Sequence, residues 1–143
     1  MSPRMDKNRE PLVSVVMPVY NCEAFIADAV DSVLNQTFSD FELLVIDDCS
    51  TDQTLEIIGR YTDERIKVIN KQLNSGITDS LNIGIEQARG KYIARMDGDD
   101  ICELNRFQAQ FDFLERHPEV GVAGSWYTII GTGELITVPE AHE

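Results

Sequence analysis

LVSVVMPVY at residues 12–20 is an almost unbroken run of apolar and β-branched residues. A strand that is buried on both faces, as in a parallel sheet covered by helices, has this composition. FELLVI at residues 41–46 is a second such run, and IKVIN at residues 66–70 and YIARM at residues 92–96 are shorter ones. The sequence therefore predicts four strands of one sheet.

The segments that follow these strands carry apolar residues at helical spacing. The predicted helices are residues 24–35, a segment with Leu55, Ile58 and Tyr61 on one face, residues 76–88 and residues 104–116. Ser50 or Thr51 can cap the second helix, and Gly90 is a stop signal just past the third. The alternation of strand and helix predicts the α/β class with a mostly parallel sheet.

The two ends of the chain are less regular. Residues 1–10 are predicted to form a disordered tail, which leaves one domain over residues 11–143. Residues 120–130 have the composition of a further strand, residues 131–133 that of a turn, and residues 135–138 that of a short closing strand. The residues interpreted as packing residues are Cys49, Cys102 and Trp126.

Length, charge and cysteine content limit the possible functions. A chain of 143 residues with 43% hydrophobic residues can build one core. The formal net charge of −13 repels nucleic acids and acidic membrane surfaces, and no basic stripe offsets it. Three cysteines without paired spacing predict neither a disulfide framework nor a zinc site. The cysteine pattern favours a reducing cytosol, and the negative charge predicts that no nucleic acid is bound. No apolar run is long enough to span a bilayer, so we expect a soluble protein.

Polar residues gather directly after three of the predicted strands: PVYN at residues 18–21, DDCSTD at residues 47–52 and DGDD at residues 97–100. The carboxyl ends of parallel strands share one edge of a sheet, where α/β proteins bind ligands. Two like charges about 4 Å apart repel by roughly 4 kcal/mol at an effective dielectric near 20, so clustered aspartates favour a hard divalent cation, Mg²⁺ or Mn²⁺. Asp97 and Asp99 are the predicted ligands, and Gly98 between them is expected to leave room for a diphosphate.

Each cluster taken alone also has a purely structural interpretation. Aspartates that follow strands commonly cap helices or form turns, and Asp-Gly is a standard turn dipeptide. Tyr20 can stack on a base or cover the edge of the sheet, and the sequence favours neither. Two acidic clusters at corresponding strand ends, however, favour a binding site.

Four stretches together resemble the inverting glycosyltransferases of family 2, which have the GT-A fold. They are VSVVMPVYN at residues 13–21, SVLNQTFSDFELLVIDDCSTDQT at residues 32–54, NSGITDSLNIGIEQARGKYIARMDGDDI at residues 74–101 and RFQAQFDFLERHPEVGVAG at residues 106–124. The resemblance implies a Rossmann-like three-layer sandwich of the nucleotide-diphospho-sugar transferase type. Residues 11–143 would be its nucleotide-sugar-binding part, truncated on the C-terminal side.

The same resemblance implies roles for individual residues. Asp47 and Asp48 would read the base and ribose side of a nucleoside-diphosphate sugar. Asp97 and Asp99 look like the family's DxD motif, which contacts ribose and holds Mn²⁺ or Mg²⁺ on the diphosphate, and Asp100 would share the metal. The other residues implied at the donor site are Pro18, Val19, Tyr20, Asp52, Gly76 and Arg95.

The implied activity is transfer of the sugar, from a UDP- or dTDP-sugar, to a hydroxyl of a saccharide or lipid-linked acceptor in polysaccharide or glycolipid synthesis. The family's general base lies in a later acidic motif, which we expect beyond Glu143, so no catalytic residue is identified within the chain. The isolated chain is therefore expected to bind its donor far better than it turns the donor over. Association with the cytosolic face of a membrane would come through missing regions.

Four other functions are compatible with parts of this pattern. A nucleotidyltransferase would carry a glycine-rich, basic loop after the first strand, and residues 18–23 contain no Gly, Lys or Arg. A phospho-accepting receiver module would need a lysine at a later strand end, which the sequence does not place. A dinucleotide-binding domain would show GxGxxG after the first strand. A non-catalytic nucleotide-binding module stays open, and a hydrolysis assay on the nucleotide sugar separates it from an active enzyme.

Overall fold

A computed structural model describes residues 9–136 of the chain. It divides the chain after Phe107 into two compact units, of which the first contains the sheet and every predicted site residue. Of the predicted disordered tail, residues 1–10, only Arg9 and Glu10 are described, and Arg9 forms an ion pair with Asp40 at 2.7 Å. Within residues 9–136 no helix has the length and apolar character needed to cross a bilayer.

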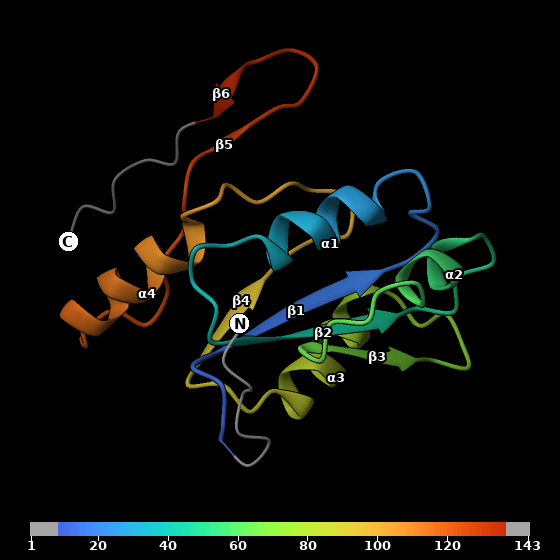
Figure 1. Cartoon of the computed structure of the whole chain (residues 1–143), viewed down its shortest axis with the longest axis horizontal. Coiled ribbons are helices and arrows are strands. Elements are labelled where there is room, and N and C mark those ends of the chain that lie inside the picture. Colours follow the sequence, from blue (N-terminus) through green and yellow to red (C-terminus); the bar gives the residue numbers. More distant parts are fainter. Residues whose placement is uncertain (1–8, 137–143) are drawn as a thin grey trace. The chain divides into compact units, whose positions relative to one another are not determined.

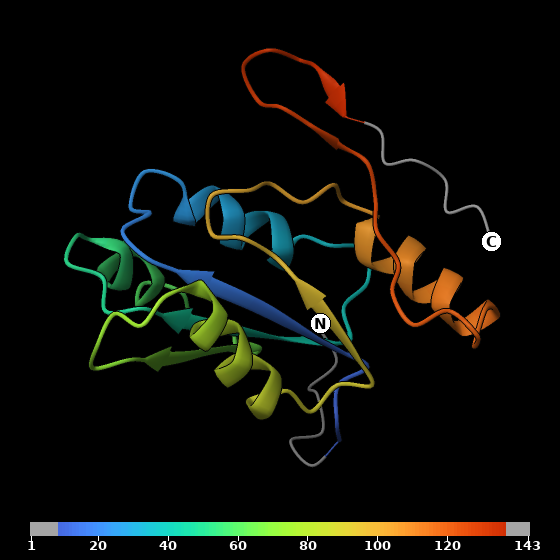
Figure 2. The ribbon, with the colours of Figure 1, turned by 180° about the vertical axis from the view of Figure 1, so that it is seen from behind.

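The first unit is an α/β layer structure, as the sequence predicts (Figure 1). Four parallel strands form one sheet in the order β3-β2-β1-β4. Figures 1 and 2 show helices α1 and α3 on opposite faces of this sheet. The elements are β1 (Val13–Val19), α1 (Ile26–Leu34), β2 (Phe41–Asp47), α2 (Thr54–Ile58), β3 (Ile66–Asn70), α3 (Ile77–Gln87) and β4 (Tyr92–Arg95).

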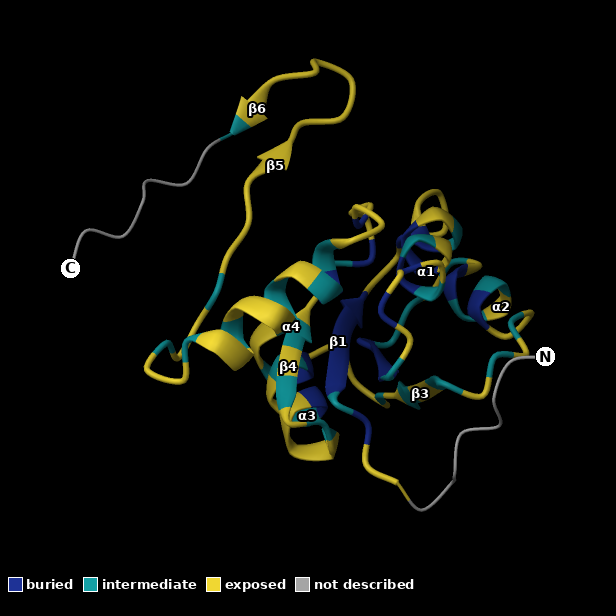
Figure 3. Cartoon of the chain, turned by 60° about the vertical axis from the view of Figure 1, so that its left-hand side comes forward, coloured by how far each residue is buried: buried dark blue, intermediate teal, exposed yellow. Residues whose placement is uncertain are grey.

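Strands β1 and β2 are buried along their whole length, which explains their unbroken apolar sequences. All seven positions of each strand are buried, and β1 is dark blue in Figure 3. Val16, Leu44 and Ile46 form a core cluster against which Leu81 of α3 packs. Gly84 of α3 lies so close to Val16 that an added methyl group would overlap the valine side chain. The two central strands therefore form the core that fixes the position of the site.

Strand β4 is short, and this allows a proline in the central strand β1. Pairing between β1 and β4 ends at Val16 and Arg95, whereas pairing between β1 and β2 continues to Val19 and Asp47. Pro18 lies beyond the last residue paired with β4, so its missing N–H costs no bond to that strand. The predicted strand at residues 92–96 is observed one residue shorter.

Helix α2 is shorter than predicted, and a different residue binds its first turn. Tyr61 lies outside the helix, and neither Ser50 nor Thr51 caps it. Instead, Asp52 Oδ1 accepts a hydrogen bond from the backbone N–H of Thr54 at 2.9 Å. Aspartate side chains commonly bond a backbone group two residues ahead. Asp52 makes this bond here, in place of the hydroxyl groups of Ser50 and Thr51.

Gly90 does not end α3 as a left-handed cap residue. The helix ends at Gln87, the next residue is extended, and Gly90 has no positive φ. A Cβ at Gly90 would lie 2.5 Å from the backbone nitrogen of Ser14 and 2.7 Å from the carbonyl carbon of Val13. The position therefore requires glycine because the chain passes directly against the backbone of β1.

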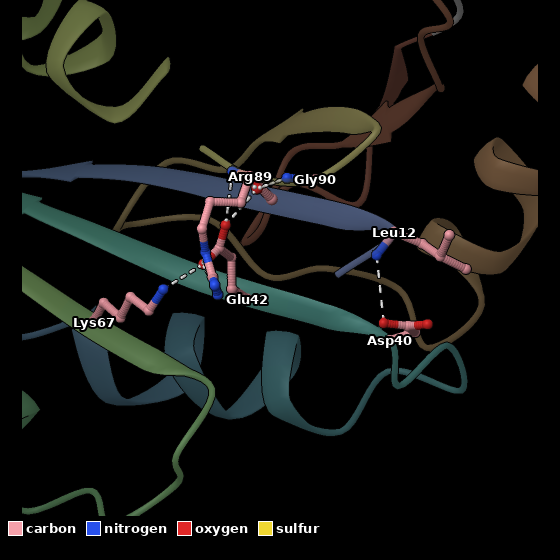
Figure 4. Close-up of polar contacts among 7 residues, drawn as sticks. Leu12, Asp40, Glu42, Lys67, Arg89 and Gly90 are labelled. Atoms are coloured by element: carbon pink, nitrogen blue, oxygen red, sulfur yellow. Dashed lines mark hydrogen bonds and ion pairs between the residues drawn. The ribbon is translucent and has the colours of Figure 1, made fainter. Parts of the chain in front are cut away.

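A buried carboxylate holds the same segment on the sheet (Figure 4). Glu42 of β2 accepts hydrogen bonds from Ser14 Oγ at 2.7 Å and from the Arg89 backbone N–H at 3.0 Å. It also pairs with Lys67 Nζ at 2.7 Å and with Arg89 Nη2 at 3.1 Å. Burial alone would raise the pKa of Glu42, but the bonds from Lys67, Ser14 and Arg89 outweigh it and lower the pKa to about 2. Glu42 thus joins three strands to the segment after α3.

Replacing Glu42 by glutamine is expected to lower the free energy of unfolding by about 1–3 kcal/mol near pH 7, because the buried partners lose a charged acceptor. The lowered pKa means that Glu42 stabilises the fold above pH 4.5 and loses this effect as the pH falls from 4.5 to about 2. Urea titrations near pH 7 and about pH 3 should show a smaller pH dependence for E42Q than for the unchanged chain. Equal unfolding midpoints for the two proteins near pH 7 would contradict this role.

The second unit contains most of helix α4 (Arg106–Arg116) and a hairpin much smaller than predicted. The hairpin pairs β5 (Tyr127–Thr128) with antiparallel β6 (Leu135–Ile136). Its turn includes Gly131 and Gly133, both with positive φ, in agreement with the predicted turn. The predicted strand at residues 120–130 is wrong apart from residues 127–128. Of the predicted closing strand at residues 135–138, the last two residues lie outside the described part.

Exposure of the apolar side chains in residues 120–130 accounts for this difference. Val122 is 88% exposed, Trp126 58% and Ile130 73%, and the hairpin is almost entirely yellow in Figure 3. A β-branched run forms a strand only where another strand pairs with it, and here the pairing covers two residues of each strand. The interpretation of Trp126 as a packing residue is therefore also wrong.

Candidate functional site

The predicted polar clusters lie at one edge of the sheet. β1, β2 and β3 run in the same direction (Figure 1), and the last residues of β1 and β2, Val19 and Asp47, are paired. The acidic loop after β4 lies beside the end of β1, because a Cβ at Gly98 would come within 2.7 Å of Val19 Cγ1 and 3.2 Å of Cys22 Sγ. Asp47 and Asp97 therefore belong to the same edge.

Gly98 serves packing, which corrects the expectation that it leaves room for a diphosphate. It is buried, whereas Asp99 and Asp100 beside it are exposed. The space that a side chain at this position would need is filled by Val19 and Cys22. The glycine thus seats the acidic loop on β1.

The far side of the acidic loop is anchored to the end of α1. The backbone N–H of Cys102 donates to Ser32 Oγ at 3.0 Å. The Gln36 amide donates to the carbonyl of Glu103 at 2.7 Å and accepts from the backbone N–H of Phe107 at 3.1 Å. Cys102 itself is buried, as predicted. These bonds hold the C-terminal side of the acidic loop, and the packing of Gly98 against Val19 holds its other side.

The carboxylates of this loop are close enough to influence one another. Asp97 forms two hydrogen bonds with the Arg95 guanidinium, at 3.1 and 3.2 Å. Partial desolvation by the neighbouring residues and, after it, the negative charges of Asp99 and Asp97 raise the pKa of Asp100. Across residues 9–136, no three or more His, Cys, Asp or Glu side chains are gathered as ready-made metal ligands. The loop therefore concentrates negative charge without a preassembled metal site.

In the second cluster, Asp47 is buried and only half satisfied. Its Oδ2 accepts a hydrogen bond from the Ser50 backbone N–H at 3.0 Å. Its Oδ1 is the one buried side-chain oxygen or nitrogen in the described residues without a hydrogen-bond partner. A buried acceptor without a partner lowers the free energy of unfolding by roughly 1–3 kcal/mol. Buried polar atoms of this kind are expected mainly at functional sites.

Hydrogen bonds join the loops after β1 and β2. Asn21, with φ of 46°, donates its backbone N–H to Ser50 Oγ at 3.0 Å, and its Oδ1 accepts from the Thr51 N–H at 2.8 Å. Asp52 Oδ2 accepts from the Glu23 N–H at 3.1 Å. Burial alone would raise the pKa of Asp52, but the hydrogen bonds from Thr54 and from the Glu23 N–H lower it. Asp52 is thus a link between the two loops.

Of the first-strand residues predicted at the site, one is exposed. Tyr20 is 49% exposed, whereas Pro18 and Val19 are buried within β1. Cys49 is half-buried and has φ of 65°, so it belongs to the turn after β2 as much as to the packing. Tyr20 is the part of this predicted set that a ligand can contact directly.

Asp48 connects the end of β2 to the start of α3. Its carboxylate accepts hydrogen bonds from the backbone N–H groups of Ser75 at 2.9 Å and Gly76 at 2.8 Å, and it pairs with Lys71 Nζ at 2.7 Å. Burial alone would raise the pKa of Asp48, but Lys71, Ser75 and Gly76 lower it. Gly76 has φ of 91°, which favours glycine. Gly76 therefore lies at the predicted site as a donor to Asp48.

Asn21 belongs to the predicted PVYN cluster, but the bonds by which it joins the two loops were not predicted. Two further residues were not predicted from the sequence: Lys71 at this edge, and Gln36 after α1, which binds the segment beyond the acidic loop. Gln36 and Lys71 gave no local signal, because their partners lie far away in sequence or on another element.

Comparisons with known proteins identify a family. The family model described as glycosyl transferase family 2 matches residues 14–142. The putative glycosyltransferase EpsE of Bacillus subtilis is 41% identical over 132 residues, covering 90% of this chain and 45% of that protein. The Escherichia coli UDP-Glc:alpha-D-GlcNAc-diphosphoundecaprenol beta-1,3-glucosyltransferase WfgD is 34% identical over 125 residues, covering 87% of this chain and 49% of that protein.

A solved structure shares the fold. Staphylococcus aureus TarS, residues 1–349, in complex with UDP-GlcNAc superposes with a TM-score of 0.71 at 34% identity. The superposition covers 74% of this chain and 32% of the TarS chain. The present chain thus spans about half the length of the curated relatives that it matches.

Proposed function

The chain belongs to glycosyl transferase family 2, and on that premise we propose that it forms the part of a glycosyltransferase that binds the sugar donor. The donor would be a nucleoside-diphosphate sugar, and a UDP- or dTDP-sugar is preferred. TarS, which is similar in sequence and fold, was crystallised with UDP and with UDP-GlcNAc, and this favours UDP over the other nucleotides.

The convergence of three polar loops at one edge of the sheet carries this proposal. Asp47, Asp48 and exposed Tyr20 would face the base and ribose, and Asp52 holds the loops around them together. Asp97, Asp99 and Arg95 would face the diphosphate. Strands β2, β1 and β4 lie side by side in the sheet, so one extended donor would contact the loops that follow all three.

A divalent ion is part of the proposal. Carboxylate oxygens such as those of Asp97, Asp99 and Asp100 are the ligands that Mn²⁺ and Mg²⁺ prefer, and Mg²⁺ commonly binds through one or two carboxylates plus substrate phosphates. An acidic loop without three assembled ligands fits an ion that arrives with the donor. The ion would stabilise the negative charge that develops on the departing diphosphate.

The acceptor would be a hydroxyl group of a saccharide or a lipid-linked saccharide, in polysaccharide or glycolipid synthesis at the cytosolic face of a membrane. The name of the similar WfgD protein specifies a diphosphoundecaprenol-linked sugar, which favours a lipid-linked acceptor. We assign no general base within residues 9–136, so donor binding is a more direct test than turnover.

Isothermal titration with UDP, dTDP and GDP, each with Mn²⁺ and with a chelator, tests the proposal. We expect binding of at least one nucleotide that is at least about tenfold tighter with Mn²⁺, because phosphates approach a protein of net charge −13 more easily when a cation neutralises part of the charge. Absence of metal-dependent binding to all three nucleotides would overturn the proposal.

A further inference from the structure

Lys71 is a buried lysine that the proposed donor contacts do not use. It follows β3 directly, and its side chain is 7% exposed. Its Nζ lies 2.7 Å from Asp48 Oδ1, 2.8 Å from Asp79 Oδ2 and 3.1 Å from Ser80 Oγ. A lysine ammonium has three donors, and all three are used by these oxygens. Lys71 is therefore not available as a direct ligand for a phosphate.

The environment keeps this ammonium charged. Burial alone would lower the pKa of Lys71, but the hydrogen bonds and negative charges of Asp48 and Asp79 outweigh it and raise the pKa. Asp79 is itself fixed by Ser75 Oγ at 2.5 Å. The cation is thus held between two carboxylates, one of which is a predicted nucleotide ligand.

Asp48 keeps a free acceptor position despite these contacts. A carboxylate offers about four acceptor positions. Within the described residues, Oδ1 accepts from Ser75 N–H and Lys71, and Oδ2 accepts from Gly76 N–H. One position on Oδ2 remains, and its direction depends on the three bonds that fix the carboxylate.

We propose that Lys71 is a positioning residue for nucleotide binding: it fixes the Asp48 carboxylate so that the remaining position on Oδ2 accepts a hydrogen bond from an N–H group of the nucleotide base. This inference rests on the proposed function, because it assumes that Asp48 faces a base. The geometry supports it through the short Lys71–Asp48 distance, the burial of both side chains and the use of all three Lys71 donors.

The Lys71→Met variant tests the inference, because methionine retains the length of the side chain and removes its charge. With Mn²⁺ present, its affinity for the tightest-binding nucleotide among UDP, dTDP and GDP is expected to fall by about 10- to 100-fold, the range that is typical for residues that orient metal ligands. The factor by which Mn²⁺ tightens nucleotide binding should not change, because Lys71 contacts the base-side carboxylate and not the DGDD loop. A general loss of structure would lower that factor as well as the nucleotide affinity.

Lys67→Met is the control, on the strand β3 that Lys71 follows directly. Lys67 also pairs with a buried carboxylate, Glu42, at 2.7 Å, but this pair lies away from the strand ends that carry the site. The Lys67→Met variant should lose stability and keep its nucleotide affinity. Circular dichroism establishes that each variant is folded before its affinities are compared.

A double-mutant cycle with Asp48→Asn shows whether Lys71 acts through Asp48. We expect Lys71→Met to cost little further affinity once Asp48 is neutral, and the double variant avoids the uncompensated buried carboxylate that could prevent the single variant from folding. Unchanged nucleotide affinity in Lys71→Met, or an equal loss in the Asp48→Asn background, overturns the inference while the proposed function stands. If the unchanged chain binds none of the nucleotides, the proposed function fails first and the inference fails with it.

Discussion

The Gly90→Ala variant is expected to lose about 3 kcal/mol of its free energy of unfolding, near the upper end of the usual cost of overpacking. The added methyl carbon would lie 2.5 Å from the backbone nitrogen of Ser14 and 2.7 Å from the carbonyl carbon of Val13. Backbone atoms of a central strand cannot rotate away as a side chain can, so the whole segment after α3 must shift. That shift would also disturb the bonds from Arg89 and Gly90 to Ser14 Oγ, now 3.1 and 2.8 Å long.

Urea unfolding followed by far-ultraviolet circular dichroism measures this loss. Gly121→Ala is the matched control, because nothing lies within 4 Å of an added Cβ there and Gly121 has no positive φ. Its stability should remain within about 0.5 kcal/mol of the unchanged chain, as for ordinary surface substitutions. Equal stabilities of the Gly90 and Gly121 variants would mean that the close approach at Gly90 does not constrain the fold.

The central strands could be predicted from the sequence because their burial is complete. A strand covered on both faces has almost no polar residue, so β1 and β2 were located to within one residue at each end. The same rule failed for residues 120–130, which are equally rich in apolar residues but expose them. An apolar, β-branched composition shows that a segment can form a strand. Whether the segment does form one depends on whether another strand lies beside it.

The sequence predicted that the acidic residues lie at strand ends, but it did not predict their hydrogen-bond partners. Parallel strands bring their carboxyl ends together, so Asp47 and Asp97 were correctly expected at one edge. The partner of each carboxylate was not predictable, because Asp48 bonds Lys71 and Gly76 through a loop whose path depends on α3. The packing of Gly98 could not be predicted either, since its neighbour Val19 lies far away in the sequence.

Neutralising the DGDD loop should have opposite effects on nucleotide binding with and without metal. With Mn²⁺ present, Asp99→Asn is expected to weaken nucleoside-diphosphate binding by at least about tenfold, since loss of a ligand should cost no less than loss of a group that orients one. With a chelator present, the same variant should bind at least as well as the unchanged chain, because one charge that repels the phosphates is gone. Asp97→Asn should behave alike, although it also removes one of the two oxygen acceptors that bind the Arg95 guanidinium.

This reversal of sign separates a metal ligand from an acidic residue that only holds the loop. If Asp99 had only a structural role, Asp99→Asn would weaken nucleotide binding both with Mn²⁺ and with a chelator. Removal of an unrelated surface charge would change nucleotide binding under neither condition. Glu64→Gln is the control for an unrelated surface charge, because Glu64 is exposed and precedes β3, at the opposite edge of the sheet. Titrations of the three variants with the same nucleotide therefore decide whether the exposed carboxylate beside Gly98 binds the ion. Equal losses with and without Mn²⁺ in Asp99→Asn would remove Asp99 from the metal site.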